Sequence, residues 1–125
     1  MAMVSLAQRG NFVHVYDFRV RPGTGEEFIR LFDSFDYSDD NPMHKSSAQA
    51  KDGVLCRDVN DPDHFYLLGE WKDIKVHADI LKVLREMKPE FVGLIEGGPS
   101  KFVPVYAEIV SSTPQDILDK AAAAE

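Results

Sequence analysis

The feature that most constrains the fold is a hairpin signal near the middle of the chain. Two apolar segments, 53–59 (GVLCRDV) and 64–71 (HFYLLGEW), are separated by NDPD, whose asparagine, aspartates and proline favour a tight turn. Segments with helical periodicity lie on both sides of this hairpin, and a further strand-like segment lies beyond each of them. The chain is therefore expected to run in the order β-α-β-β-α-β.

The first strand and the first helix are predicted from local signals. Residues 12–20 (FVHVYDFRV) are rich in β-branched and aromatic side chains, and Pro22-Gly23 ends this strand. The next segment begins with a capping-box pattern, in which Thr24 and Glu27 each satisfy a free backbone donor of the helix. Its apolar face consists of Phe28, Leu31, Phe32 and Phe35. These residues predict a helix that packs against the sheet.

The second half of the chain repeats this pattern. Asp73 is expected to cap a second helix that ends before Pro89. Its apolar face consists of His77, Ile80, Leu81 and Leu84. The last strand, 101–110 (KFVPVYAEIV), contains Pro104, which favours an edge position or a bulge because proline donates no ladder hydrogen bond. Thr113-Pro114 is typical of the start of a short tail helix. Residues 36–52 are expected to interrupt the pattern, with a short helical turn after Pro42.

This order of elements predicts an α+β chain with the ferredoxin-like βαββαβ arrangement, an antiparallel sheet with both helices on one face. We expect an N-terminal extension at 1–11, one domain at 12–110 and a tail helix at 111–125. In both outer strands, each of the two alternating sets of side chains contains several apolar members. The face without helices therefore needs a cover, and a second copy of the chain, giving a homodimer, is the simplest one.

Composition narrows the classes of partner. The chain has 125 residues and 44% hydrophobic content, which suits one compact domain. A net charge of −7 without a basic cluster argues against a nucleic-acid partner. The lone Cys56 forms no internal disulfide and is expected to be a small buried side chain. No stretch approaches the roughly 20 apolar residues of a membrane span, so we expect no membrane partner and a soluble, cytoplasmic protein.

Three segments together resemble a known family. FVHVYDFRVRPGTGEEF, DGVLCRDVNDPDHFYLLGEW and KFVPVYAEIV resemble the antibiotic biosynthesis monooxygenase (ABM) domain of the dimeric α+β-barrel superfamily, over about Phe12 to Val110. The resemblance implies a homodimer with its sheets packed face to face and a pocket in each subunit between sheet and helices. It also implies oxidation of aromatic phenols or quinols by molecular oxygen, without flavin, haem or metal as cofactor.

The sequence departs from the family pattern at two places. Family members commonly carry E-x-W at the end of the third strand, whereas this chain has Gly69-Glu70-Trp71. Because strand side chains alternate, Glu70 is expected to point toward the partner subunit or solvent, and Trp71 to be a packing anchor that can also wall the pocket. The broken segment 36–52 replaces a continuous helix and could form a lid. The haem-degrading branch of the superfamily is not expected, because Tyr16 replaces its strand asparagine and the second helix lacks tryptophan.

The catalytic candidates are His14 and His77, because an imidazole accepts a proton near neutral pH. A hydrogen-bonded core histidine explains each of them at least as well. His64 is expected to be solvated, and His44 to be an exposed loop residue or part of a lid. The candidates for substrate binding are Tyr16, Tyr66, Trp71 and Arg85. Core packing of the aromatics and a solvated helix face for Arg85 are the alternatives.

No metal site is predicted, because the sequence contains no HxH, HExxH or paired Cys/His spacing. The favoured function is that of a cofactor-independent monooxygenase. The alternative is a non-catalytic dimeric binding module that holds a small apolar or aromatic molecule on the same scaffold.

Overall fold

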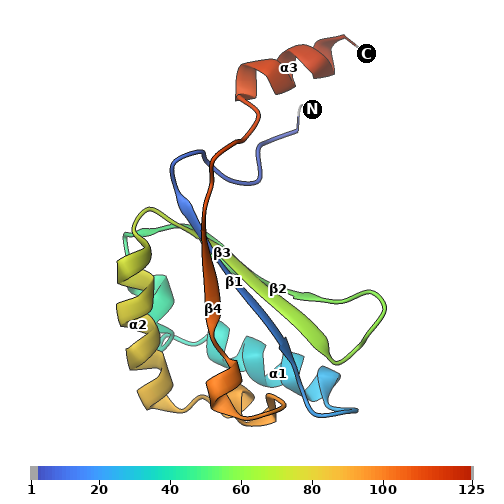
Figure 1. The fold of residues 1–125 in the computed structure, drawn as a ribbon, viewed down its shortest axis with the longest axis vertical. Helices are drawn as coiled ribbons and strands as arrows, with labels where there is room; N and C mark the ends of the chain where they lie inside the picture. Colours follow the sequence, from blue (N-terminus) through green and yellow to red (C-terminus); the bar gives the residue numbers. More distant parts are fainter. Residues whose placement is uncertain (1–2, 125) are drawn as a thin grey trace.

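The computed structural model describes residues 3–124 and has the predicted α+β, ferredoxin-like order of elements (Figure 1). The helices and strands are β1 (Phe12–Arg19), α1 (Gly25–Asp36), β2 (Gln49–Arg57), β3 (His64–Trp71), α2 (Ile74–Met87), β4 (Pro104–Glu108) and α3 (Gln115–Ala123). Three short 3₁₀ helices lie between them: η1 (Pro42–Lys45), η2 (Glu90–Leu94) and η3 (Pro99–Lys101). Within residues 3–124, no helix has the length and apolar character needed to cross a membrane.

The four strands form one antiparallel sheet in the order β2-β3-β1-β4. β1 and β3 occupy the centre, and His14 of β1 lies opposite Gly69 of β3. β4 is an edge strand and begins at Pro104, as predicted from the missing backbone donor. The register places His14, Tyr16 and Phe18 on one face of the sheet, because alternate residues of a strand share a face.

Both α1 and α2 cover this face, since their apolar sides form one core with it. The buried core consists of Tyr16, Phe18, Val20, Phe28, Phe32, Phe65, Leu67, Leu81, Leu84, Phe91, Val92, Ile95 and Phe102. Phe28 and Phe32 come from the predicted apolar face of α1, and Leu81 and Leu84 come from that of α2. The aromatic side chains of this core fix the distance between the helices and the sheet.

The predicted capping box at the start of α1 is wrong. Thr24 lies at the N-cap, but its hydroxyl donates to the carbonyl of Arg21, and Glu27 pairs with Arg30. The carboxylate of Asp63, on the turn before β3, takes over the capping role and accepts hydrogen bonds from the backbone N–H groups of Gly23 and Gly25, both at 3.0 Å. The hairpin turn therefore anchors the beginning of α1.

The start of α2 agrees with the prediction. The side chain of Asp73 accepts a hydrogen bond from the backbone N–H of Lys75 at 3.0 Å. The helix ends at Lys88, which has a left-handed backbone with φ of 49°, directly before Pro89. Asp73 and Pro89 thus delimit the helix that carries His77.

Two boundaries differ from the sequence-based expectation. β2 begins at Gln49, four residues before the predicted start at Gly53, and its pairing with β3 is irregular between Gln49 and Val54. The tail helix α3 begins at Gln115 with Pro114 at its N-cap, and Thr113 makes no side-chain cap. The predicted interruption after α1 is confirmed, because only the short helix η1 lies between α1 and β2.

The other face of the sheet carries no helix of the domain, and an apolar row crosses it. Val54, Leu68, Val15 and Val105 are successive cross-strand neighbours on this face. Val54 and Val105 are 56% and 68% exposed. Cys56 is half-buried on the same face. An apolar row of this kind is unusual on a sheet surface that faces only water.

Glu70 points to this second face, whereas Trp71 points to the helix-covered face, as the alternation predicts. The expected exposure of Glu70 to solvent is wrong, because the N-terminal segment covers it and leaves it 5% exposed. Its carboxylate accepts hydrogen bonds from the backbone N–H of Gln8 at 2.9 Å and from the side chain of Asn11 at 2.7 Å. Glu70 therefore fixes the N-terminal segment to the sheet.

Candidate active site

The centre of the candidate site is a hydrogen bond between two buried residues of neighbouring strands. The indole Nε1–H of Trp71 donates to Nδ1 of His14 at 2.9 Å. An indole nitrogen only donates, so Nδ1 of His14 carries a lone pair and no proton. A neutral His14 therefore has its proton on Nε2. Trp71 sets the tautomer of His14.

His77 reaches the same place from α2. Its ring stacks on that of His14 with the centroids 4.4 Å apart. Its Nδ1 lies 2.9 Å from the hydroxyl of Tyr106, and its Nε2 lies 3.3 Å from the hydroxyl of Tyr16. Tyr16 is 2% exposed, whereas Tyr106 on the edge strand is 38% exposed. A hydrogen-bonded chain thus runs from a buried phenol through His77 to the surface.

Burial keeps both imidazoles neutral at physiological pH. It lowers the pKa of His77 to about 4. Burial, with a smaller contribution from the neighbouring His77, lowers the pKa of His14 to about 3. The pKa of the Tyr16 hydroxyl is raised, first by burial and then by Tyr106, so this hydroxyl stays protonated. The site holds neutral hydrogen-bonding groups rather than charges.

A cavity of about 50 Å³ lies beside these residues, between the sheet and the helices. Its lining includes three polar side chains of the cluster just described, His14, Tyr16 and His77. Its apolar wall includes Phe32, Phe35, Met43, Leu67, Leu84, Phe91 and Phe102. A water molecule needs at least roughly 10–15 Å³, so the cavity has room for only a few small molecules. Pockets for drug-sized ligands are about 300–1,000 Å³.

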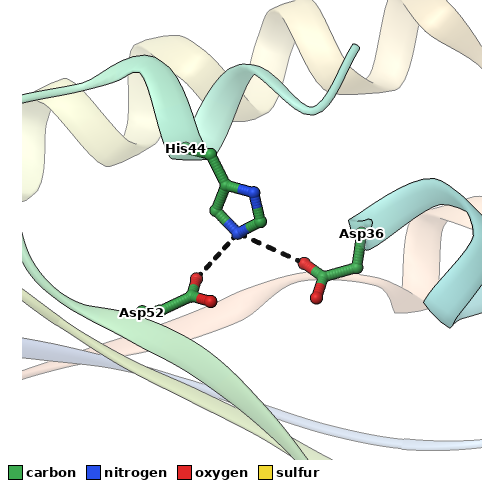
Figure 2. A group of neighbouring side chains, drawn as sticks. All are labelled: Asp36, His44 and Asp52. Carbon is green, nitrogen blue, oxygen red and sulfur yellow. Dashed lines mark hydrogen bonds and ion pairs between the residues drawn. The ribbon is translucent and has the colours of Figure 1, made fainter. Parts of the chain in front are cut away.

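Asp36, His44 and Asp52 line the cavity at its exposed end. Figure 2 shows these three side chains. The imidazole of His44 lies between the two carboxylates, with Nε2 2.8 Å from Oδ1 of Asp52 and 3.4 Å from Oδ1 of Asp36. Burial raises the pKa of Asp36. One potential ligand atom from each residue lies within 4.8 Å of the others, so the three side chains could hold a divalent cation. As they stand, they connect η1 to α1 and β2.

Three of the predicted substrate-binding residues lie away from the cavity. Tyr66 points to the opposite face of the sheet, where its hydroxyl donates to Asp58 at 2.8 Å. Arg85 donates to the carbonyl of Phe102 at 2.7 Å and lies outside the cavity lining. Trp71 is fully buried behind His14 and supports the site without lining the cavity. Tyr16 is the predicted binding residue that does line it.

The other two histidines lie in separate places. His44 belongs to the mouth of the cavity, and its side chain is 36% exposed. His64 was expected to be solvated, but it pairs with Asp17 on the helix-free face and its side chain is 15% exposed. His14 and His77 are the two histidines that the fold brings together at the base of the cavity.

Tyr106 and Gly69 were not predicted as site residues. Tyr106 pairs with His14 in the sheet register, which puts its hydroxyl on the helix-covered face. A Cβ atom at Gly69 would lie 2.6 Å from Cε1 of His14, so the ring of His14 occupies the place of the missing side chain. The alternation of side chains in 101–110 was a usable signal for Tyr106, whereas no local signal marked Gly69.

Comparison with known proteins gives the fold. Neither a protein-family model nor a curated protein sequence matches the chain. Among solved structures, a candidate antibiotic biosynthesis monooxygenase from Bordetella bronchiseptica is similar with a TM-score of 0.62 and 16% identity, over 82% of this chain and 100% of that one. A candidate antibiotic biosynthesis monooxygenase from Chloroflexus aurantiacus J-10-fl is similar with a TM-score of 0.53 and 15% identity, over 83% and 97%.

A variant of SnoaB, a cofactor-independent oxygenase from Streptomyces nogalater, is also similar. Its TM-score is 0.56 at 12% identity, and the likeness covers 82% of this chain and 93% of SnoaB. The chain therefore has the ABM-like fold that the sequence resemblance implied. Identities this low establish shared architecture alone, so chemistry has to be argued from the residues of this chain.

Proposed function

We propose that this protein is a cofactor-independent monooxygenase that oxidises an aromatic phenol or quinol with molecular oxygen. The observation that carries the proposal is the position of His77. A neutral imidazole lies between two tyrosine hydroxyls at the polar end of an aromatic cavity, where it can take a proton from a phenol. The likeness in fold to a named cofactor-independent oxygenase supports the same reaction class.

The proposed reaction needs no electron source other than the substrate. The phenol loses its hydroxyl proton, and the ring carbon para to that oxygen, now electron-rich, transfers an electron to oxygen. The resulting superoxide joins the ring radical through a new C–O bond, giving a peroxide anion that is then protonated. The O–O bond breaks as the proton on the same carbon leaves, which releases water and a quinone. Phenol and oxygen thus give quinone and water.

His77 is the proposed carrier of the first proton. Because its pKa is low, His77 does not stay protonated, so it passes the proton on to another group. The relay has an outlet, because Tyr106 hydrogen-bonds to Nδ1 of His77 and is partly exposed. Tyr16, held on the other nitrogen, is placed to donate a hydrogen bond to the substrate once His77 turns to the phenol.

Access for the substrate is proposed to require movement of the cavity wall. The present volume of about 50 Å³ is too small for a polycyclic phenol. Met43 and His44, which form part of the wall, belong to the short helix η1. The contacts of His44 with Asp36 and Asp52 close this wall and are exposed enough to break at low cost. Segment 37–48 is the proposed lid.

We also propose that two copies of the chain associate through the helix-free face of the sheet. The row of Val54, Leu68, Val15 and Val105 supports this, because it exposes apolar surface in the middle of a sheet. Val105→Glu should convert the dimer into a monomer in sedimentation velocity. Val59→Glu, on the 96% exposed turn outside the row, is the matched control and should leave the dimer intact.

The test of the function is oxygen uptake by metal-free, flavin-free protein with a panel of hydroquinones and polycyclic phenols. With phenols that carry hydrogen on the para carbon, labelled oxygen should place one atom in the quinone and the other in water. His77→Leu should lower kcat by about 10²–10⁴, the range for loss of a general base. Tyr66→Phe, on the other sheet face, should retain full activity. Uptake that is absent with the whole panel, or unchanged in His77→Leu, would overturn the proposal.

A binding module is the second candidate, and the size of the cavity favours it. A cavity of about 50 Å³ that combines apolar walls with neutral hydrogen-bonding groups suits capture of a ligand of a few heavy atoms. Calorimetry distinguishes the two functions. Tight binding of a phenol with no oxygen uptake would select the binding module.

A further inference from the structure

The most unusual polar atom of the site is Nε2 of His14. His14 is 4% exposed, and within residues 3–124 its Nε2 has no hydrogen-bond partner. The bond from Trp71 to Nδ1 puts the proton of the neutral ring on Nε2. A buried N–H group without an acceptor is rare, because its desolvation is uncompensated. The fold therefore maintains a hydrogen-bond donor that no residue of the described chain uses.

Two glycines lie next to this donor. Gly69 of β3 and Gly53 of β2 lie side by side, since a Cβ atom built on Gly69 falls 3.4 Å from the Cα of Gly53. The same Cβ position lies 3.0 Å from Nε2 of His14. His14 and Gly53 both line the cavity. A side chain at Gly69 would crowd the edge of the imidazole that carries the free proton, whereas a Cβ atom on Gly53 would have no atom of His14 within 4 Å.

The volume of the cavity suggests what this donor can meet. A space of about 50 Å³ accepts a molecule of two or three heavy atoms without displacing the wall. The carboxylates of Asp36 and Asp52 also line the cavity, but they lie at its mouth and face the imidazole of His44. Tyr16 and His77, which also line the cavity, are hydrogen-bonded to each other, so the Nε2–H of His14 is the unpartnered donor for a small acceptor in the buried part.

We propose that the Nε2–H of His14 is the binding site for the oxygen anion formed during the reaction, first superoxide and then the peroxide of the substrate. This inference rests on the proposed monooxygenase function and assigns His14 a role different from that of a base. The electron moves from substrate to oxygen, and the new charge on oxygen accepts the hydrogen bond. His14 keeps its Nε2 proton while the C–O bond forms, so it acts as a hydrogen-bond donor and not as an acid.

The tautomer separates the roles of the two histidines. The only basic lone pair of neutral His14 is on Nδ1, and the indole of Trp71 already occupies it. His77 makes its bonds to hydroxyl groups, which can reverse their direction, so it can accept a proton. His77 moves the proton, and His14 stabilises the anion.

The first experiment measures the tautomer directly. Long-range ¹H–¹⁵N NMR of histidine-labelled protein at neutral pH should show His14 protonated on Nε2 and unprotonated on Nδ1. Sodium azide, a small anion, should then shift the Nε2–H resonance of His14 saturably and leave the resonances of His64 unchanged. A proton on Nδ1, or an Nε2–H resonance that azide does not move, would overturn the inference.

The second experiment compares two variants of the same side-chain length. His14→Gln keeps an N–H donor close to the position of Nε2, whereas His14→Met removes it. We expect His14→Gln to remain within about ten-fold of the wild-type kcat and His14→Met to lose on the order of 10²–10³, the usual effect of removing one oxyanion donor. Equal losses in both variants would overturn the donor role. Thermal unfolding of both variants verifies that each is folded.

Failure of this inference is distinguishable from failure of the proposed function. Oxygen uptake by the wild type that depends on His77, combined with equal losses in His14→Gln and His14→Met, would remove the anion site and leave the monooxygenase. The absence of uptake with every phenol would remove the monooxygenase. The anion-site inference would be overturned with it, and an azide shift would then show only a site for small anions.

Discussion

Trp71 and His14, 57 residues apart in the chain, share a buried hydrogen bond of 2.9 Å from the indole Nε1–H to Nδ1 of the imidazole. The bond joins the end of β3 to the middle of β1 and fixes which nitrogen of His14 carries a proton. The tryptophan thereby has a chemical as well as a packing role. The position of the proton on His14 therefore depends on a residue that does not line the cavity.

Trp71→Phe tests this dependence. The variant removes the donor and leaves Nδ1 of His14 buried without a partner, so the free energy of unfolding should fall by about 1–3 kcal/mol in urea titrations. The proton of His14 should then distribute between the two nitrogens in ¹H–¹⁵N NMR spectra. A variant that keeps the proton on Nε2 alone would show that another contact fixes the tautomer.

Gly69→Ala should disturb the same ring from the other side. The added Cβ would lie 2.6 Å from Cε1 of His14, so the ring must move, and we expect a loss of about 1–3 kcal/mol of stability. Gly53→Ala is the matched control, because its Cβ would meet its nearest described neighbour, the carbonyl of Leu68, at 3.4 Å. Urea titration of both variants measures the difference. Equal losses would contradict the proposed crowding of His14.

The stability of the protein should fall as the pH is lowered below about 6.5. The unfolded chain binds protons on both histidines near their ordinary pKa of 6.5, whereas the folded protein binds them only near a pKa of about 3 for His14 and about 4 for His77. Above pH 6.5 neither state is protonated, so these groups contribute no slope. Below pH 6.5 the unfolded state binds more protons than the folded state. Each histidine then lowers the free energy of unfolding by about 1.4 kcal/mol per pH unit.

Urea titrations at a series of pH values measure this slope. The double variant His14→Gln/His77→Gln keeps the carboxylates of the protein and lacks the two imidazoles, so its stability should depend less steeply on pH between about 4.5 and 6.5. The same slope in wild type and double variant would contradict burial of two neutral histidines.

Asp63→Ala should destabilise the start of α1. The carboxylate of Asp63 accepts the N–H groups of Gly23 and Gly25, so its loss should cost about 1 kcal/mol in urea titrations. Asp63→Asn retains an acceptor and should lose less. Thr24→Ala should have a smaller effect than Asp63→Ala, because Thr24 makes no side-chain cap. A larger loss of stability in Thr24→Ala than in Asp63→Ala would support the predicted capping box instead.

His44→Ala should accelerate ligand binding. Removing the imidazole breaks its contacts with Asp36 and Asp52, which close the proposed lid, so a phenol should associate faster in stopped-flow quenching of Trp71 fluorescence. His64→Ala is the control, because its pair with Asp17 lies on the other face of the sheet. Stability should change by less than about 1 kcal/mol, as for exposed ion pairs. An unchanged association rate would show that the phenol enters the cavity by another route.

The features that could be predicted from the sequence were those specified by neighbouring residues. The bounds of β3 at His64–Trp71 and the cap at Asp73 follow from alternation, turn residues and a single side chain before a helix. His14 and His77 were each identified by position on an apolar face. That their rings stack depends on how α2 crosses the sheet, which no local pattern specifies.

The features that were missed depend on contacts between distant residues. Asp63 displaces the expected capping box because a turn 38 residues away lies against Gly25. Tyr66 and Tyr106 both alternate along strands, and only the register decides that Tyr106 faces His77 whereas Tyr66 faces away. The group of Asp36, His44 and Asp52 comes from α1, η1 and β2, so no motif spacing could reveal it.

The first and last segments of residues 3–124 are hydrogen-bonded to each other, and this has a practical use. Gly10 donates its N–H to the carbonyl of Ile109 at 2.9 Å, and the side chain of Gln115 donates to the carbonyl of Met3 at 2.9 Å. In Figure 1 the tail helix α3 stands clear of the sheet, away from α1. A short linker that joins Met3 to the region of Gln115 should allow circular permutation, with new ends opened at the exposed turn around Val59. Such a rearranged chain would offer attachment points for a reporter while the histidine pair stays enclosed.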